Sequence, residues 1–238
     1  MARTYVYIDA LNFYYGAVKN TANKWVDFEA LARLLVPRDT IGCIRYFTAP
    51  ITPRYATDKG HERQNALLRA MGGNPLIKIH KGHFRSDVKW RALADQQFAV
   101  RDLFRPQLYP DVVARWLIAS SRRRSTKPFS AVRVLIDEEK GSDVNLGSYL
   151  VYDASTKACS KAIVITNDSD LAEPIRLATT FGIQVGLVNP HPGTTSRHLR
   201  QVASFQIPFR RGVVAKCQLP ATVLDHRGRQ IHRPKEWR

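Results

Sequence analysis

The stretch AIVITNDSDLAEPIRLATTFGIQVGLV, residues 162–188, decides the fold class. It begins with a short apolar run rich in β-branched residues, continues with apolar residues at helical spacing from Leu171 to Phe181, and ends with a second apolar run. A helix between two short, fully apolar runs is typical of a βαβ unit with buried parallel strands. The crossover that joins such strands is right-handed in nearly all proteins.

The same alternation extends toward the N-terminus. Helical patterns cover residues 28–35 after a cap at Asp27, residues 61–71 before a glycine pair, and residues 144–158. Four further apolar runs read as strands: YVYI (5–8), IGCIRYF (41–47), LIKI (76–79) and VRVLI (132–136). The sequence therefore predicts an α/β fold, a three-layer sandwich around a central, mostly parallel sheet.

Two segments interrupt this pattern. Residues 85–130 combine arginines, aromatic residues and the run SSRRRSTKP, and we interpret them as a basic, partly helical insertion. Residues 209–238 mix Arg, Lys, Pro and Gly with isolated apolar residues, which suits an extension packed on or trailing the domain. We therefore predict one domain over residues 1–208, with the insertion inside it and the basic extension after it.

The net charge of +17 is unevenly distributed. Residues 78–133 carry +9 and residues 209–238 carry +6, whereas residues 134–208 carry −2. A basic excess of this kind favours nucleic acid as the partner over a plain soluble surface or an anionic membrane contact, and the charge alone does not choose between RNA and single-stranded DNA. The predicted contacts to nucleic acid are Arg85, Arg122, Arg123, Arg124, Lys140, Arg210 and Arg211.

The sequence also bears on the compartment and on partners. The first residues lack the pattern of a secretory signal, and no run of about 18 apolar residues follows. Cys43, Cys159 and Cys217 are far apart and suit a reducing environment. We expect a soluble cytoplasmic protein without a membrane contact, and the sequence leaves a homo-oligomer or a protein partner open.

Four aspartates are the candidate catalytic carboxylates. Asp9 ends the first apolar run, Asp168 and Asp170 follow residues 162–166, and Asp143 stands at the start of a helix. Because parallel strands end at one edge of the sheet, these side chains are expected close together. Crowded carboxylates need a compensating cation, and hard oxygen ligands favour Mg²⁺ or Mn²⁺. The sequence therefore predicts a metal site, although Asp143 alone also suits a simple helix cap.

Neighbouring polar groups suit a supporting role. Asn12 lies one helical turn beyond Asp9, Thr166 and Asn167 precede Asp168, and Ser142 precedes Asp143. Each also suits an ordinary turn or cap. Either Glu138 or Glu139 can face the cluster, since adjacent residues of an extended segment point to opposite sides.

Three ordered blocks resemble a known family: YIDALNFYYG, EEKGSDVNLGSYLVYDA, and AIVITNDSDLAEPIRLA followed by GIQVGLVNP. They are similar to the blocks of NYN-domain proteins, the PIN-like nucleases that include bacterial proteins of the LabA type. The match runs from about residue 4 to 208, and the ending QLP with a terminal RPKEW resembles the close of many bacterial members. The resemblance does not extend to the basic insertion.

The resemblance implies a PIN-like α/β/α sandwich and carries the family's acidic residues onto Asp9, Asp143, Asp168 and Asp170, with Asn12 as a supporting catalytic group. It implies hydrolysis of phosphodiester bonds, most often in RNA, with Mg²⁺ or Mn²⁺. We therefore expect a metal-dependent endoribonuclease. The alternatives are a non-catalytic PIN-like module that binds nucleic acid or recruits a partner, and a hydrolase of small phosphate esters, which leaves the charge of +17 without a purpose.

Overall fold

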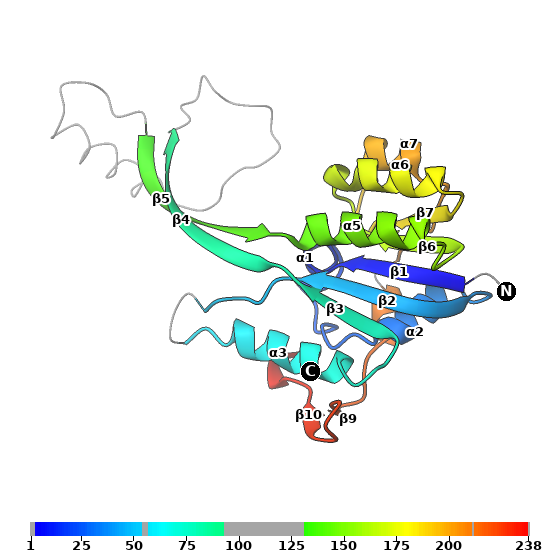
Figure 1. Ribbon diagram of the computed structural model, residues 1–238. Helices are drawn as coiled ribbons and strands as arrows, with labels where there is room; N and C mark the ends of the chain where they lie inside the picture. Colours follow the sequence, from blue (N-terminus) through cyan, green and yellow to red (C-terminus); the bar gives the residue numbers. More distant parts are fainter. Residues whose placement is uncertain (1–2, 54–56, 93–130, 211, 238) are drawn as a thin grey trace. The chain divides into compact units, whose positions relative to one another are not determined.

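The computed structural model describes residues 3–53, 57–92, 131–210 and 212–237 (Figure 1). The chain divides into two compact units. The first combines Met1–Phe84 with Glu139–Arg238, and the second is Arg85–Glu138. Each unit is described by itself.

A six-stranded sheet forms the centre of the first unit, in the order β3-β2-β1-β6-β7-β8. Every neighbouring pair in it is parallel. The strands are β1 (Arg3–Asp9), β2 (Thr40–Thr48), β3 (Ile77–Lys81), β6 (Lys161–Ile165), β7 (Gln184–Val188) and β8 (Phe205–Gln206). The central strands are buried on both faces, which accounts for their continuous apolar runs.

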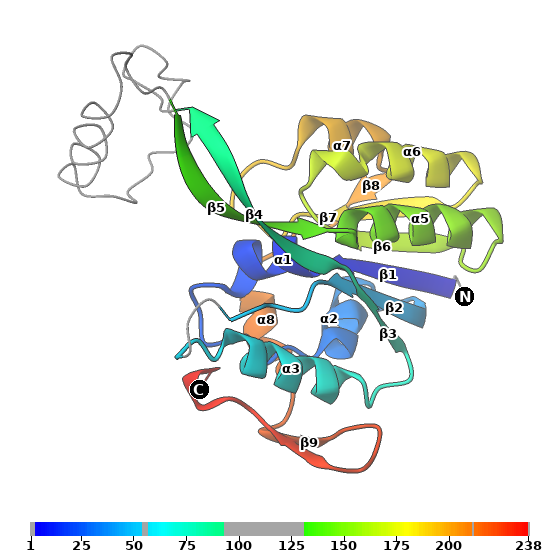
Figure 2. The same ribbon diagram turned by 60° about the vertical axis from the view of Figure 1, so that its left-hand side comes forward.

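Helices cover both faces of this sheet (Figure 2). On one face lie α5 (Ser142–Ser155), α6 (Ala172–Thr180) and α7 (Arg197–Val202). On the other face lie α1 (Ala10–Phe13), α2 (Phe28–Leu35), α3 (Gly60–Met71) and α8 (Gly212–Lys216). Shorter helical turns are η1 (Tyr14–Val18), η3 (Ser169–Leu171) and η4 (Lys235–Trp237). The predicted three-layer α/β/α sandwich is therefore confirmed.

Strand β1 contributes side chains to both hydrophobic cores of the first unit. Tyr5 and Tyr7 pack into the core under α5 and α6, and Val6 and Ile8 pack into the core over α2 and α3. The alternation follows from the two-residue period of a strand.

Among the described helices, none is long and apolar enough to cross a membrane.

The run VRVLI (132–136) does not join the central sheet. It lies in β5 (Ala131–Lys140), which pairs with β4 (His83–Ala92) in a separate two-stranded sheet. Leu135 is 67% exposed, so this apolar run is not a buried strand, and its placement in the parallel sheet was wrong. Residues 85–92, the start of the expected insertion, form most of β4. The rest of the insertion, which we predicted to be partly helical, lies outside the described ranges.

The C-terminal stretch packs on the first unit. Its strands β9 (Thr222–Leu224) and β10 (Gln230–His232) pair antiparallel. The indole Nε1 of Trp25 donates a hydrogen bond of 2.8 Å to the carbonyl of Pro220, and the rings of Trp25 and Trp237 lie 6.2 Å apart. Arg69 forms a 3.0 Å ion pair with the buried carboxylate of Asp225. These contacts attach the extension to the segment that precedes α2 and to α3.

Candidate active site

The order of the strands reverses between β1 and β6, which lie side by side in the sheet (Figure 1). Open α/β sheets bind their ligands beyond the carboxyl ends of the strands at such a reversal. Asp9 is the last residue of β1, and Thr166 directly follows β6. The structure therefore places these two predicted site residues where a ligand is expected.

The carboxylate of Asp9 is buried, with 5% of the residue exposed. Its Oδ1 accepts a hydrogen bond of 3.0 Å from the backbone N–H of Asn12, and its Oδ2 accepts one of 2.9 Å from the hydroxyl of Thr166. Burial raises the pKa of Asp9 to about 6, and the charges of Asp168 and Glu139 add to this, although the two hydrogen bonds oppose it. Asp9 therefore holds a proton more readily than an ordinary aspartate.

The hydroxyl of Thr166 connects Asp9 to the turn after β6. It donates to Asp9 and accepts a hydrogen bond of 3.1 Å from the backbone N–H of Asp168. Asp168 in turn caps η3, because its Oδ1 accepts from the backbone N–H of Asp170 at 3.0 Å. The side chain of Thr166 thus fixes the distance between the end of β1 and the acidic turn.

Two asparagines form a second connection. The side-chain oxygen of Asn12 accepts a hydrogen bond of 2.9 Å from the backbone N–H of Asn167. The side-chain oxygen of Asn167 accepts one of 2.8 Å from the backbone N–H of Ser196. The start of α1 and the loops after β6 and β7 are therefore held together by side-chain oxygens, and the oxygen of Asn12 supports the site.

Asp143 reaches the cluster from the first turn of α5. Burial raises its pKa to about 7, and the negative charges of Asp9, Asp168, Glu139 and Asp170 raise it further. The structure therefore brings together the four predicted aspartates. It also adds Glu139, whose Oε1 accepts a hydrogen bond of 3.1 Å from the backbone N–H of Ser142.

A close crossing of two backbones fixes the start of α5. At Gly82, a Cβ atom would overlap the carbonyl oxygen of Lys140 and lie 2.7 Å from Oε1 of Glu139. Gly141, the N-cap of α5, has a φ of 93°, a left-handed conformation that glycine adopts without strain. These two glycines allow the segment after β3 to pass directly against the turn that carries Ser142 and Asp143.

The arrangement suits proton transfer near neutral pH. A general acid or base works best when its pKa is close to the working pH, and Asp9 and Asp143 have pKa values of about 6 and about 7. Perturbed carboxyls of this kind cluster at functional sites. The two groups can therefore accept and donate protons in turn.

The described residues do not support the predicted metal site. Within the described ranges, no group of three or more His, Cys, Asp and Glu side chains is arranged to hold a metal ion. The charges of Asp9, Asp168 and Asp170 act on Asp143. In the described part of the chain, however, these side chains do not make up a metal-holding group.

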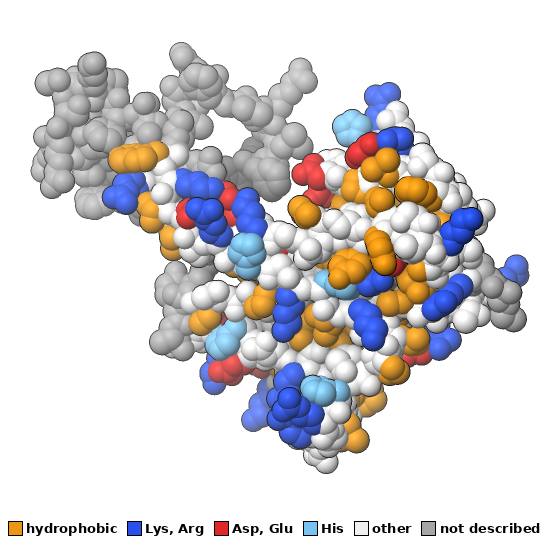
Figure 3. Space-filling view, viewed as in Figure 1, with side chains coloured by type: hydrophobic (Ala, Val, Ile, Leu, Met, Phe, Trp, Pro, Cys, Tyr) orange, Lys and Arg blue, Asp and Glu red, His pale blue; other side chains and the backbone are white. Residues whose placement is uncertain are grey.

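The predicted basic contacts belong partly to each unit and partly to residues outside the described ranges. Arg85 pairs with Asp87 at 2.8 Å in the second unit, Lys140 ends β5, and Arg210 is exposed in the first unit. On the face shown in Figure 3, Lys and Arg side chains are distributed over several elements. Arg122, Arg123, Arg124 and Arg211 lie outside the described residues. A role in binding nucleic acid stays a prediction.

A polar network that sequence analysis missed lies beside the buried face of α5. Asp153 accepts from the hydroxyl of Tyr7 at 2.7 Å and forms two hydrogen bonds with Arg45, at 2.6 and 2.8 Å. His80 stacks on Phe47, and burial and the guanidinium of Arg45 lower the pKa of His80. Tyr7 and Asp153 are 146 residues apart in the sequence, so no local sequence motif indicates that they are in contact.

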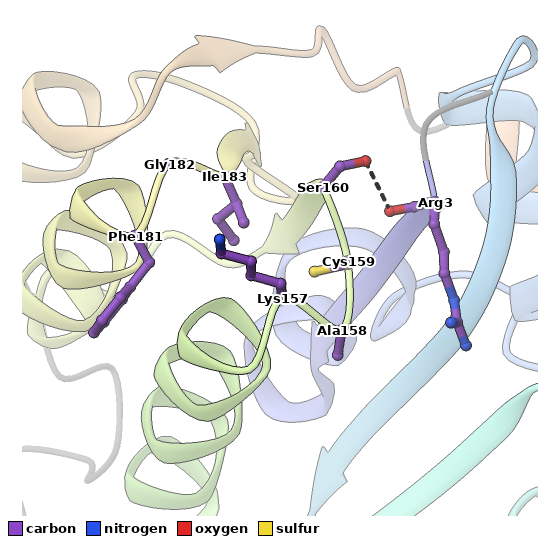
Figure 4. A pocket seen from close by; sticks show the side chains of 8 residues that line it. All are labelled: Arg3, Lys157, Ala158, Cys159, Ser160, Phe181, Gly182 and Ile183. Atoms are coloured by element: carbon purple, nitrogen blue, oxygen red, sulfur yellow. Dashed lines mark hydrogen bonds between the residues drawn. The ribbon is translucent and has the colours of Figure 1, made fainter.

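A hollow of about 520 Å³ opens at the opposite edge of the sheet, beside the amino end of β6 (Figure 4). Its lining consists of Arg3, Lys157, Ala158, Cys159, Ser160, Phe181, Gly182 and Ile183. In Figure 4 the side chain of Lys157 extends toward Gly182 and Ile183, whereas those of Arg3 and Phe181 point elsewhere. Because the two cationic groups do not converge, the carboxyl edge is the better candidate for the active site.

Comparison with known proteins bears on the function. No family model matches the chain. The chain is 28% identical, over 257 residues, to a Pseudomonas putida protein named 6-hydroxy-3-succinoylpyridine 3-monooxygenase HspA, and the match covers 99% of this chain and 75% of that protein. A crystal structure of a Vibrio parahaemolyticus protein of unknown function matches with a TM-score of 0.44 and 12% identity, over 88% of this chain and 93% of that one, which is too distant to carry an argument.

This similarity overturns the predicted function. A monooxygenase is an oxidoreductase, so the prediction of a metal-dependent nuclease is wrong, and the alternative of a non-catalytic nucleic-acid-binding module is not retained. The prediction of Mg²⁺ or Mn²⁺ as cofactor falls with it, given the lack of a ligand set in the described part of the chain. The prediction failed because crowded, buried carboxyls can be stabilised either by a bound cation or by a proton. The spacing of the aspartates in the sequence is the same for a metal site and for a proton-transfer site, so it does not distinguish the two.

Proposed function

We propose that this chain is a monooxygenase that acts on a hydroxylated pyridine ring, with the carboxyls of Asp9 and Asp143 as its proton-transfer groups. The observation that carries the proposal is the similarity to the Pseudomonas putida monooxygenase, which spans 99% of the chain. The buried carboxyls at the reversal in strand order support it, since they combine the expected position of a ligand with pKa values near neutrality.

The reaction class defines which atoms, electrons and protons must be transferred at the site. A monooxygenase inserts one atom of dioxygen into the substrate and reduces the other atom to water, which consumes two electrons and two protons. The electrons come from a two-electron donor such as a reduced nicotinamide or a reduced flavin. Proton transfers to oxygen and from the ring are therefore steps that side chains of this chain can catalyse.

Asp9 is the proposed base. In a pyridine with a hydroxyl at position 6, position 3 lies para to that hydroxyl, so loss of the hydroxyl proton raises the electron density at position 3. A carbon enriched in this way attacks electrophilic oxygen more readily. The group that position 3 carried must then leave: hydrogen leaves as a proton, and an acyl group such as succinoyl is transferred to water and leaves as a carboxylic acid. With a pKa of about 6, Asp9 is mostly ionised at pH 7 and able to accept the proton.

Asp143 is the proposed acid. Its pKa of about 7 leaves close to half of the molecules protonated at neutral pH, so that it can donate to the oxygen atom that leaves as water. Thr166 and Glu139 position the pair, the first through its hydrogen bond to Asp9 and the second through the N–H of Ser142.

The carboxyl edge does not fit the pyrophosphate of a dinucleotide. Such a group binds at a glycine-rich turn that opens a helix after the first strand. Here the turn after β1 reads Asp9, Ala10, Leu11 and Asn12, and α1 has four residues. A pyrophosphate at this place would face the carboxyls of Asp9 and Asp168. The proposal therefore assigns this edge to the substrate ring and no step to a bound dinucleotide.

Oxygen consumption by the purified chain tests the proposal. The chain is supplied with 6-hydroxy-3-succinoylpyridine or 2-hydroxypyridine and, in turn, NADH, NADPH or reduced FMN. We expect oxygen uptake that depends on the substrate, with an oxygenated product detected by mass spectrometry. Asp9→Asn should lower kcat by roughly 10²- to 10⁴-fold, whereas Glu62→Gln, which changes an exposed carboxyl on α3, should leave it unchanged. The absence of substrate-dependent uptake with every donor would refute the proposal.

The scaffold itself is proposed to be NYN-like. Support comes from the three sequence blocks and from the order of Asp9, Asp143 and Asp168 along a sandwich of the expected type. An RNA partner for the basic segments also stays a proposal, supported by the net charge of +17. Affinity for RNA that falls steeply with salt would support it, since phosphate contacts release counterions.

A further inference from the structure

A cluster of exposed arginines lies where the hairpin of β9 and β10 meets the end of α3. Arg69 belongs to the last turn of α3, and Arg227 and Arg229 belong to the turn that joins β9 to β10. The side chains of Arg69 and Arg229 are 47% and 55% exposed, and Arg227 is exposed as well. Figure 3 shows Lys and Arg side chains gathered over this hairpin, at the lower end of the view. We call these three residues the arginine surface.

The buried carboxylate of Asp225 orders the arginine surface. Its Oδ1 accepts hydrogen bonds of 2.9 Å from the backbone N–H groups of Arg227 and Arg229, which fixes the turn. Its Oδ2 accepts from the guanidinium group of Arg69 at 3.0 Å and from that of Arg229 at 2.9 and 3.0 Å. The two guanidinium groups therefore lie side by side on one oxygen, in an orientation that is set before any ligand binds.

One carboxylate does not neutralise three arginines. Burial raises the pKa of Asp225, but the hydrogen bonds from Arg229, Arg69 and Arg227 outweigh burial and hold this pKa well below its ordinary value, so Asp225 is ionised. Arg227 has no ion-pair partner within the described ranges. A guanidinium has five N–H donors, and Asp225 takes one from Arg69 and two from Arg229. The arginine surface thus keeps excess positive charge and donors for another acceptor.

The backbone beneath this charge is firmly held. Ile231 on β10 is 4% exposed and packs into the core over α3. At Gly73, just beyond α3, a Cβ atom would lie 2.7 Å from the carbonyl oxygen of Leu224. Gly228 has a φ of 73°, a conformation that lets the chain turn between the two arginines of the hairpin. Side chains that are ordered in advance lose less conformational entropy when they bind a ligand.

The chemistry of the arginine surface suits the phosphates of a polyanionic chain. A guanidinium in a fixed orientation matches the oxygens of a phosphate, and a strand of nucleic acid offers a phosphate at every nucleotide. An anionic membrane is a poorer match, because membrane-binding surfaces usually insert apolar side chains beside their cations. In the hairpin, residues 222–232, Leu224 is the exposed large apolar residue, and Ile231 points into the core.

We infer that Arg69, Arg227 and Arg229 bind the phosphate backbone of a single-stranded nucleic acid, at a place separate from the carboxyl edge. Helix α3 begins after β2 and ends before β3, so its last turn and the hairpin lie at the amino ends of the parallel strands. The carboxyls lie at the opposite edge. The inference goes beyond the proposed oxygenation; it rests on the nucleic-acid partner proposed above and gives that partner a defined surface.

Fluorescence anisotropy with a short labelled single-stranded RNA, measured at several salt concentrations, tests the inference. Arg227→Gln removes one guanidinium but keeps the backbone N–H that Asp225 accepts, so the variant should fold. We expect it to weaken binding roughly fivefold at ~0.1 M salt and to lower the salt slope by about 0.7, the contribution of one phosphate contact to a single strand. Combining it with Arg69→Gln should about double the loss in slope. Arg200→Gln, which changes an exposed arginine on α7, is the matched control and should leave both values unchanged.

The outcomes separate the arginine surface from the other proposals. RNA binding that is unchanged in folded Arg227→Gln, or that falls equally in Arg200→Gln, would reject the surface and keep the RNA partner. A wild type that binds vesicles of anionic phospholipid and no RNA would reject both. Oxygen uptake is read independently, because the arginine variants should retain the uptake of the wild type. Arginine-dependent RNA binding without any substrate-dependent uptake would support the surface and reject only the monooxygenase.

Discussion

Asp143→Asn should stabilise the fold at alkaline pH and have little effect at acidic pH. The carboxyl of Asp143 has an ordinary pKa of 3.8, which applies to the unfolded chain, and a pKa of about 7 in the folded chain. Between these values the folded state binds more protons than the unfolded state, so the free energy of unfolding falls as pH rises from about 4 to about 7. Above pH 7 the wild type carries the full cost of an ionised Asp143, and asparagine removes it.

The magnitude follows from the two pKa values. Their separation of about 3 units corresponds to about 4 kcal/mol at ~1.4 kcal/mol per unit. Because Asp143 is partly open to solvent, screening lowers this to roughly 2 kcal/mol. Loss of the favourable interaction between a carboxylate and a helix start removes about 0.5 kcal/mol. We therefore expect Asp143→Asn to gain roughly 1–2 kcal/mol at pH 8 and close to nothing at pH 4.

Urea denaturation followed by circular dichroism, at intervals from pH 4 to pH 8, measures this difference. Glu62→Gln is the matched control, since it removes an exposed carboxyl on α3, away from the cluster. Its stability difference from the wild type should not change with pH. A gain from Asp143→Asn that is the same at pH 4 and pH 8, or a loss at pH 8, would refute the reasoning from burial and mutual repulsion.

Three further changes test other parts of the structure. Thr166→Val removes a hydrogen bond to the carboxylate of Asp9 and should raise the pKa of Asp9 above about 6, as read from carboxyl chemical shifts against pH; a lower value would contradict the geometry. Asp153→Asn leaves Arg45 without its charged partner and should cost about 3–5 kcal/mol in unfolding free energy, so a change under 1 kcal/mol would show that the pair is not buried as described. Gly82→Ala should lower Tm, because its Cβ would overlap a main-chain carbonyl, and an unchanged Tm would mean that the crossing can open.

The parts of the fold that depend on local pattern were predictable. Helix α2 covers the predicted residues 28–35, since the carboxylate of Asp27 accepts from the N–H groups of Glu29 and Ala30 at 3.0 Å. Strand β5 was misplaced because an apolar run does not reveal which strand it pairs with. Its exposed Leu135 could only be found in three dimensions.

The candidate site was predictable in position and not in chemistry. Asp9 and Asp168 directly follow strand patterns, which places them at one edge of a parallel sheet. The spacing of the aspartates is compatible with a metal site and with a proton-transfer site. The prediction of a nuclease came from the resemblance to NYN-domain proteins. The similarity to a monooxygenase decided against it.

The source of the inserted oxygen tests the central claim most directly. The purified chain turns over a 6-hydroxypyridine substrate with a reduced donor under ¹⁸O₂ in ordinary water, and in parallel under ordinary dioxygen in H₂¹⁸O. Mass spectrometry of the hydroxylated ring should find one labelled oxygen atom from dioxygen and none from water, and Asp9→Asn should lower the rate at which this labelled product forms by roughly 10²- to 10⁴-fold. A product whose new oxygen comes from water, with no label from ¹⁸O₂, would show that dioxygen is not the source of the inserted oxygen and would contradict the account.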